Sequence, residues 1–257
     1  MTAIRSKLKK SLRRLLGFTG YTLFNSRRYY ARDGVLTIHN DHFRKDPAFQ
    51  AAYARGVKAS QGIDPQFDWR VHIALWAARA AVRLPGDFVE CGVNAGFISS
   101  AIMQNLNWSA VAKRFYLIDT FNGPVLEQYS AEEVDRGRRQ VAEDAMAAGA
   151  YVRDIERVRA NFAEWPNSIV VQGAVPDILQ PLDIGNVAFL HIDLNCAQPE
   201  QQALAFFWDR LSPGALVLLD DYAYFGHECQ ARAIDEVARD IGFHVLSLPT
   251  GQGLIVK

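Results

Sequence analysis

The sequence has few cysteines, no long apolar run and no excess of charge of either sign. Its three cysteines, Cys91, Cys196 and Cys229, are widely spaced and form no C-x-x-C pair, so neither a disulfide framework nor a thiolate zinc site is predicted. No run approaches the roughly 20 apolar residues of a membrane-spanning helix. We therefore expect a protein of a reducing, cytoplasmic compartment.

Charge is nevertheless distributed unevenly along the 257 residues, in which 28 basic and 28 acidic side chains sum to zero. Residues 1–28 carry eight basic side chains and no acid, which leaves 20 basic and 28 acidic side chains in the remainder. The zero total argues against a generally basic nucleic-acid binder. Ile4, Leu8, Leu12 and Leu15 recur at helical spacing between the basic residues, which predicts a short basic amphipathic helix.

Two interpretations of that basic segment stay open. It could contact an anionic partner or the inner surface of the membrane as a peripheral element. It could equally pack on its own domain and leave a solvated basic face. Its apolar stretch, residues 15–24, is short and no small-residue cleavage site follows it, so a signal peptide is not predicted.

Beyond about Asp68, helical patterns alternate with short apolar runs that have the length of strands. These runs cover residues 87–91, 115–119, 169–172, 187–193, 215–221, 244–248 and 253–257. Near-continuous apolar runs separated by helices predict a parallel sheet buried on both faces, and the last two runs are close enough to form a hairpin. We expect a doubly wound, Rossmann-like α/β fold with seven strands, mostly parallel with an antiparallel last strand. It would occupy residues 61–257, after a basic N-terminal helical extension over residues 1–60.

In such a sheet ligands bind at the carboxyl ends of the strands. The first strand ends in Glu90 and leads into a turn with Gly92 and Gly96, where Gly92 permits a tight turn and Gly96 lets the next helix lie close to the strand. Asn94 stands where a dinucleotide fingerprint has its middle glycine, so pyrophosphate binding is disfavoured. An acid before this turn suits a cationic ligand group, such as the α-amino group of S-adenosylmethionine.

The second strand ends in Asp119, which is followed by Thr-Phe-Asn-Gly123. A carboxylate at this position can accept hydrogen bonds from both hydroxyls of a ribose, as a nucleoside-containing cofactor requires. The alternative is that Asp119 only caps its own turn.

Three acids end the fourth and fifth strands: Asp193, Asp220 and Asp221. Adjacent parallel strands would bring these carboxylates together, where they repel unless they are protonated or bridged by a cation such as Mg²⁺. A metal there could bind an acceptor hydroxyl and lower its pKa for O-methylation, with Asp193 as the catalytic acid–base group. In the alternative, one of the adjacent acids caps a helix and the site holds no metal; His227 is then a candidate base, although a lone loop histidine is commonly a surface residue.

Six motifs together resemble the class I S-adenosylmethionine-dependent methyltransferases and, within them, the macrocin O-methyltransferase family of sugar-modifying enzymes. They are Phe88-Val-Glu-Cys-Gly-Val93 with Gly96, Asp119-Thr-Phe-Asn-Gly123, Leu190-His-Ile-Asp193, Leu211-Ser-Pro-Gly214, Leu219-Asp-Asp-Tyr222 and Ala233-Ile-Asp-Glu236. The resemblance implies that Glu90, Gly92 and Gly96 contact the methionine part of the cofactor and Asp119 its ribose. It further implies metal and base roles for Asp193, Asp220 and Asp221. The family more often has an acid two residues beyond the Asp193 position, where this chain has Asn195.

The sequence therefore predicts an S-adenosylmethionine-dependent O-methyltransferase that acts on a hydroxyl of a sugar or glycosylated metabolite, with Mg²⁺ as a candidate second cofactor. The expected partner is this small-molecule acceptor rather than a nucleic acid, and a homo-oligomer stays open. An NAD-dependent oxidoreductase or epimerase is one alternative, but it would need a close glycine fingerprint and a Tyr-x-x-x-Lys pair, which the chain lacks. The other alternative is a non-catalytic, nucleoside-binding, membrane-associated protein.

Overall fold

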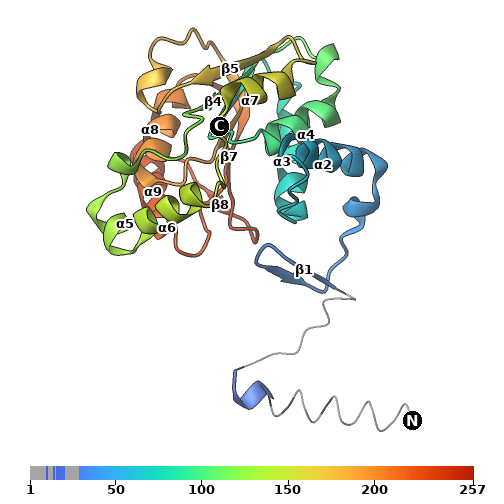
Figure 1. The fold of residues 1–257 in the computed structure, drawn as a ribbon, viewed down its shortest axis with the longest axis vertical. Helices are drawn as coiled ribbons and strands as arrows, with labels where there is room; N and C mark the ends of the chain where they lie inside the picture. The colour runs from blue at the N-terminus through green and yellow to red at the C-terminus, as the bar shows by residue number, and fades with distance from the viewer. Residues whose placement is uncertain (1–9, 11–13, 15, 21–28) are drawn as a thin grey trace. The chain divides into compact units, whose positions relative to one another are not determined.

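Figure 1 shows the computed structural model of the chain, which describes residues 10, 14, 16–20 and 29–257. The chain divides into two compact units, Met1–His42 and Phe43–Lys257. In the first unit, strands β1 (Tyr30–Arg32) and β2 (Val35–Thr37) form an antiparallel hairpin. The amphipathic helix predicted within residues 1–28 lies largely outside the described residues. Among the helices that the structure describes, none is long and apolar enough to cross a membrane.

A seven-stranded sheet with the order β5-β4-β3-β6-β7-β9-β8 forms the centre of the second unit. Its strands are β3 (Asp87–Cys91), β4 (Phe115–Asp119), β5 (Ser168–Gln172), β6 (Val187–Ile192), β7 (Leu211–Leu219), β8 (Leu246–Ser247) and β9 (Gly253–Val256). Strands β5 to β7 in this order pair in parallel, whereas β9 runs antiparallel to both of its neighbours. The predicted Rossmann-like sheet with an antiparallel last strand is confirmed. Its strand order changes direction between β3 and β6, which is where ligands bind in such sheets.

Helices cover both faces of this sheet (Figure 1). Helices α2 (Pro47–Ala59), α3 (Asp68–Ala81), α4 (Phe97–Leu106) and α7 (Ile155–Phe162) contribute to the apolar core on one face, and α8 (Ala197–Trp208) and α9 (Glu228–Ile241) to the core on the other. The shorter helices are α5 (Ala131–Asp135), α6 (Arg138–Ala147), η1 (His42–Lys45), η2 (Trp108–Ala110), η3 (Leu126–Gln128) and η4 (Asp177–Leu179). Phe88 and Val89, which are successive residues of β3, lie in different cores, which explains why apolar side chains point to both faces of this strand.

The compact unit begins at Phe43 rather than at residue 61, where the sequence predicts the domain boundary. Helix α2 belongs to the unit because Phe49 and Ala52 are buried in its core. Gly56 allows this packing, since a Cβ there would lie 2.4 Å from the ring of Phe97 on α4. Helix α2 therefore lies before the predicted boundary in the sequence but belongs to the compact unit that follows it.

The long connection between β4 and β5 contains the short η3 and three α-helices, α5, α6 and α7. A capping box of Ser130 and Glu133 begins α5. Gly137 has a positive φ of 75° and separates α5 from α6, and Gly149 follows α6.

Candidate functional site

The turn after β3 is built around two glycines at which any side chain would overlap with neighbouring atoms. Gly92 has a φ of 92°, and a Cβ there would lie 1.7 Å from the carbonyl oxygen of Asp193. Gly96 has a φ of 82°, and its Cβ would lie 2.5 Å from the ring of Phe162. The glycines thus allow β3 and β6 to end side by side and α4 to start immediately afterwards.

Asp119 connects the end of β4 to the turn after β3. Its Oδ2 accepts hydrogen bonds of 2.8 Å from the backbone N–H groups of Val93 and Asn94, and its Oδ1 accepts one of 2.6 Å from Phe121. The capping alternative therefore describes part of what Asp119 does. A carboxylate offers about four lone-pair directions. The hydroxyl of Thr120 lies 3.4 Å from Asp119 Oδ1 but has one proton, which the bond of 2.6 Å to the carbonyl oxygen of Gly123 uses. Asp119, which also lines a cavity, therefore retains capacity for a ligand hydroxyl.

Two adjoining cavities follow the carboxyl edge of the sheet and share Gly92, Asn94, Tyr151 and Asp193 in their walls. The first cavity lies over β4 and β5 and is lined by Asp119, Thr120, Gly123, Gln128, Gly173 and Val175, among others. The second cavity has a volume of about 410 Å³ and is lined by Phe67, Arg70, Glu90, Arg157 and Asp220, among others. The two spaces meet at Asp193.

Glu90 has a carboxylate oxygen that lacks a partner although the side chain is only 2% exposed. Its Oε1 lies 2.8 Å from Nδ1 of His191. Its Oε2 is buried and accepts no hydrogen bond from any residue that the structure describes. A buried carboxylate oxygen without a donor is costly, so a cationic ligand group in the adjoining cavity would satisfy it.

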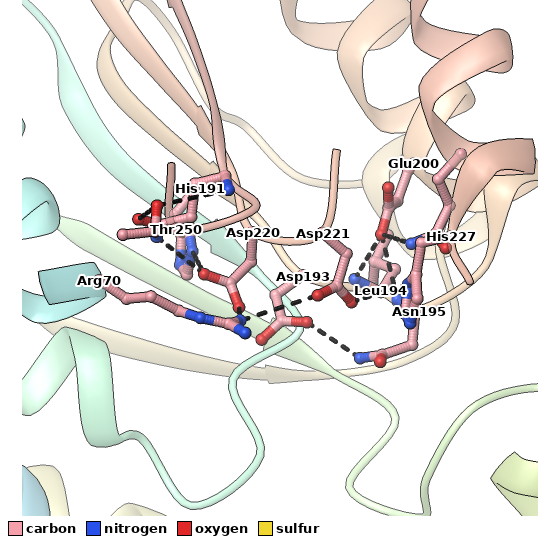
Figure 2. A network of polar contacts seen from close by, with 12 residues as sticks. Arg70, His191, Asp193, Leu194, Asn195, Glu200, Asp220, Asp221, His227 and Thr250 are labelled. Carbon is pink, nitrogen blue, oxygen red and sulfur yellow. Dashed lines mark hydrogen bonds and ion pairs between the residues drawn. The ribbon is translucent and has the colours of Figure 1, made fainter. Parts of the chain in front are cut away.

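His191 Nδ1 lies 2.8 Å from Glu90 Oε1, and its Nε2 lies 3.8 Å from Asp220 Oδ1. Figure 2 shows His191 beside Asp220. Burial lowers the pKa of His191, but the carboxylates of Asp220 and Glu90 outweigh this effect and raise it to about 10. Asp220 also accepts a hydrogen bond of 2.9 Å from Gln252. Burial opposes ionisation of Asp220, but the charges of Arg70 and His191 bring its pKa below the ordinary value, so Asp220 is ionised.

Asp193, Asp220 and Asp221, here called the acid cluster, do come together, and Arg70 of α3 reaches into them (Figure 2). Arg70 Nη1 lies 2.6 Å from Asp220 Oδ2 and 3.7 Å from Asp221 Oδ1. Of the three acids, Asp193 and Asp220 line the second cavity. Burial and the charges of Asp220 and Asp221 raise the pKa of Asp193 well above its ordinary value.

The turn after β6 is held by Glu200 of α8. Glu200 Oε1 accepts hydrogen bonds of 3.1 Å from the N–H groups of Leu194 and Asn195 and one of 2.9 Å from Gln230. Burial and the charge of Asp221 raise the pKa of Glu200 to about 8, against the opposing effect of these donors. Asn195 in turn donates a hydrogen bond of 2.9 Å to Asp193 Oδ1, so this turn orients Asp193.

His227 is only 6% exposed and does not line either of the two cavities. Its Nδ1 lies 3.2 Å from Asp221 Oδ2, on the opposite side of that carboxylate from Arg70. The structure thus places His227 against Asp221 rather than on the loop surface. Its proposed role as a base stays a prediction.

The acid cluster as described does not fit a divalent ion. Among the described residues, no group of three or more His, Cys, Asp or Glu side chains is arranged to hold a metal. Arg70, Gln252 and Asn195 already bind oxygens of the cluster. Mg²⁺ demands near-octahedral oxygen ligands at about 2.1 Å, which these contacts obstruct. The sequence does not indicate that Arg70 belongs to the site. Arg70 lies within an ordinary helical pattern, 150 residues before its partner Asp220.

The His191 contacts predict a large effect of His191→Leu on folding. The substitution removes the hydrogen-bond donor to the buried carboxylate of Glu90 and a positive charge beside that of Asp220, so we expect a loss of about 3–5 kcal/mol in the free energy of unfolding. Urea denaturation measures it, and His244→Gln, at an exposed position, is the control. Because the pKa of His191 is raised from 6.5 to about 10 on folding, its contribution is complete below pH 6.5 and is lost as the pH rises through about 10. A wild-type advantage that stays constant across that range would contradict this assignment.

The sheet order and the glycine turn define a Rossmann-like fold, and solved O-methyltransferases share it. Among solved structures, the O-methyltransferase NovP superposes with a TM-score of 0.65 at 18% identity, covering 85% of this chain and 99% of its own. The calicheamicin methyltransferase CalS11 gives 0.56 at 16% identity, covering 92% and 98%. The Podospora anserina methyltransferase PaMTH1, solved with SAH (S-adenosylhomocysteine) bound, gives 0.52 at 14%, covering 86% and 97%. At these identities the likeness concerns the fold.

The sequence comparison identifies the family. Residues 74–243 match the model of the macrocin-O-methyltransferase (TylF) family, and the chain belongs to this family. A curated relative from Streptomyces olivaceus, 8-demethyl-8-(2,3-dimethoxy-alpha-L-rhamnosyl)-tetracenomycin-C 4'-O-methyltransferase, is 30% identical over 145 residues, covering 54% of this chain. The match also covers 54% of that relative, so the chain spans about half of the relative's length. The resemblance predicted from the motifs is thereby confirmed.

Proposed function

We propose that the protein is an S-adenosylmethionine-dependent O-methyltransferase that acts on a hydroxyl of a sugar or of a glycosylated small molecule. The observation that carries the proposal is the unpartnered Oε2 of Glu90, which is buried beside a cavity that continues to Asp119. The name of the Streptomyces olivaceus relative places its reaction on a rhamnosyl-bearing compound, and a CalS11 structure is described as a TDP-rhamnose 3'-O-methyltransferase. Family membership with these relatives supports a sugar-bearing acceptor.

The residues fit the cofactor in two places. Asp119 would accept hydrogen bonds from the ribose in the first cavity, and Glu90 would accept them from the α-amino group in the second. Gly92 lines both cavities, and Gly92 and Gly96 set the shape of this turn because they leave room for the backbone of Asp193 and the ring of Phe162. Bound S-adenosylmethionine supplies a methyl group on a sulfonium centre, which is already activated for transfer.

Asp193 is the group that would handle the acceptor proton. It lies where the two cavities meet, so a hydroxyl placed there would face both the carboxylate and the methyl donor's side of the site. Burial and neighbouring charge raise the pKa of Asp193, which makes the ionised form a stronger proton acceptor. Asn195 and Glu200 orient it. A divalent ion is no part of this proposal, because the contacts of the acid cluster do not fit one.

The Glu90 assignment is tested by calorimetry with SAH. Wild-type protein is expected to bind it, and Glu90→Gln should weaken binding about 10- to 100-fold, since hydrogen bonds to charged groups contribute about 1.5–3 kcal/mol. Glu236→Gln, at an exposed position on α9, is the matched control and should bind like wild type.

Two outcomes would contradict the function itself. One is no detectable SAH binding by folded wild-type protein. The other is binding that does not change in Asp119→Ala. Unchanged binding in Glu90→Gln alone would remove only the Glu90 assignment. A peripheral contact of the basic segment 1–28 with anionic membrane lies outside the described residues and stays a separate proposal.

A further inference from the structure

Arg70 brings a permanent positive charge into the acid cluster. Its Nη1 donates a hydrogen bond of 2.6 Å to Asp220 Oδ2 and lies 3.7 Å from Asp221 Oδ1. The side chains of Arg70 and Asp220 are each only 11% exposed, so water screens this pair weakly. A guanidinium does not lose its proton in proteins, and the charge therefore persists at every working pH.

The position of Arg70 is determined by the elements around it. Helix α3 is anchored by the buried side chains of Val71, Ala74 and Leu75, which follow Arg70 in the sequence. The guanidinium carbon lies 4.8 Å from the centre of the Tyr224 ring, within the range of a cation–π contact. Arg70 is thus held between a ring of the loop after β7 and the carboxylates that end β7.

Three further oxygens of the cluster also have partners. Asp220 Oδ1 accepts a hydrogen bond from Gln252, and Asp193 Oδ1 accepts one from Asn195. Asp221 Oδ2 lies 3.2 Å from His227. Side chains from α3, from the turn before β9 and from the turn after β6 therefore surround the three acids.

This arrangement conflicts with a divalent ion. Such an ion bound to Asp220 Oδ2 would lie about 2.1 Å from that oxygen, whereas Arg70 Nη1 lies 2.6 Å from the same atom. Two positive charges would then compete for one oxygen at close range, and Arg70 would have to leave. Asn195, where the family more often has an acid, removes one further negative charge that could attract a metal.

We propose that Arg70 is the resident cation of the acid cluster, and that it takes the place a divalent ion would otherwise have there. Arg70 acts as a positioning residue: it holds Asp220 and Asp221 and leaves Asp193 facing the cavity. The catalytic meaning of this arrangement rests on the proposed methyltransferase function, whereas the exclusion of a divalent ion can be tested without turnover.

Mn²⁺ is the probe for this test, because its electron paramagnetic resonance signal is lost when the free ion binds to protein. Full-length wild-type protein, with and without SAH, should leave the signal of equimolar Mn²⁺ unchanged. Arg70→Met removes the charge and keeps the length of the side chain, and it should take up Mn²⁺. Adding Asp220→Asn to that variant should abolish the uptake. Arg79→Met is the control on the same helix, since Arg79 bonds Asn105 and not the cluster.

Either of two results would overturn the proposal. The first is stoichiometric Mn²⁺ uptake by the wild type that is lost in Asp193→Asn. The second is an Arg70→Met variant that is folded by circular dichroism and takes up no Mn²⁺. If Arg70→Met does not fold, Arg70→Lys keeps a positive charge and should exclude Mn²⁺, and the wild-type titration still decides. SAH calorimetry reports separately on the proposed function, so the two failures can be distinguished.

Discussion

Replacing Gly92 by alanine is expected to weaken SAH binding by more than about 100-fold, which corresponds to about 2.8 kcal/mol. The added Cβ would lie 1.7 Å from the carbonyl oxygen of Asp193, and neither atom belongs to a side chain that could turn away. Backbone hydrogen bonds of 2.8 Å join Gly92 to Ile118 and Asp193 to Cys91, so the three strand ends resist separation. The overlap must therefore displace the turn that connects Glu90 with the cavities.

Gly137→Ala is the control for Gly92→Ala, because it separates the cost of a positive φ from the cost of the steric overlap. Gly137 also has a positive φ, 75°, but a Cβ there meets nothing within 4 Å. Gly137→Ala should therefore cost only the left-handed conformation, about 1–2 kcal/mol of stability, and leave SAH binding unchanged. Calorimetry and urea denaturation of both variants provide the comparison. If folded Gly92→Ala binds SAH within a few-fold of wild type, the turn is not the rigid element described above.

The sequence predicts the edge of the sheet at which the site lies, because strand ends can be derived from local patterns. Glu90, Asp119, Asp193 and Asp220 each follow a short apolar run, and parallel strands place such ends on one edge. The alternation of Phe88 and Val89 between two cores accounts for the apolar pattern from which the strands were predicted. The strands and the edge at which their acids lie can therefore be predicted without tertiary contacts.

The partners of these acids could not be predicted in the same way. Arg70 and Asp220 are 150 residues apart, and His191 and Glu90 are 101 apart, so only the folded chain brings them together. The helical pattern around Arg70 is the same whether its side chain is solvated or buried. Packing of α2 through Phe49 likewise depends on a surface of α4 that local patterns do not describe. The sequence therefore indicates the acids, and tertiary structure decides their charge and neighbours.

Asp193→Asn is expected to lower kcat by about 10²- to 10⁴-fold, the usual contribution of a positioned acid–base group. Asparagine has nearly the same shape and can still bond Asn195, but its amide oxygen cannot take up the acceptor proton. SAH affinity should stay close to that of wild type, because the groups assigned to the cofactor are Glu90 and Asp119. A transition-state role predicts this separation of turnover from binding.

Transfer of a radiolabelled methyl group to TDP-rhamnose, or to another rhamnoside that the wild type methylates, measures the effect of Asp193→Asn. Asp240→Asn is the control, since Asp240 is exposed on α9, away from the cavities. Turnover by Asp193→Asn within a few-fold of wild type would move the proton acceptor elsewhere, and Asp220 is then the next acid on the cavity wall. Because Arg70 holds Asp220 ionised through a hydrogen bond of 2.6 Å, that acid is the weaker base of the two. The contact between Arg70 and Asp220 thus argues against a metal ion and also favours Asp193 as the group that takes up the acceptor proton.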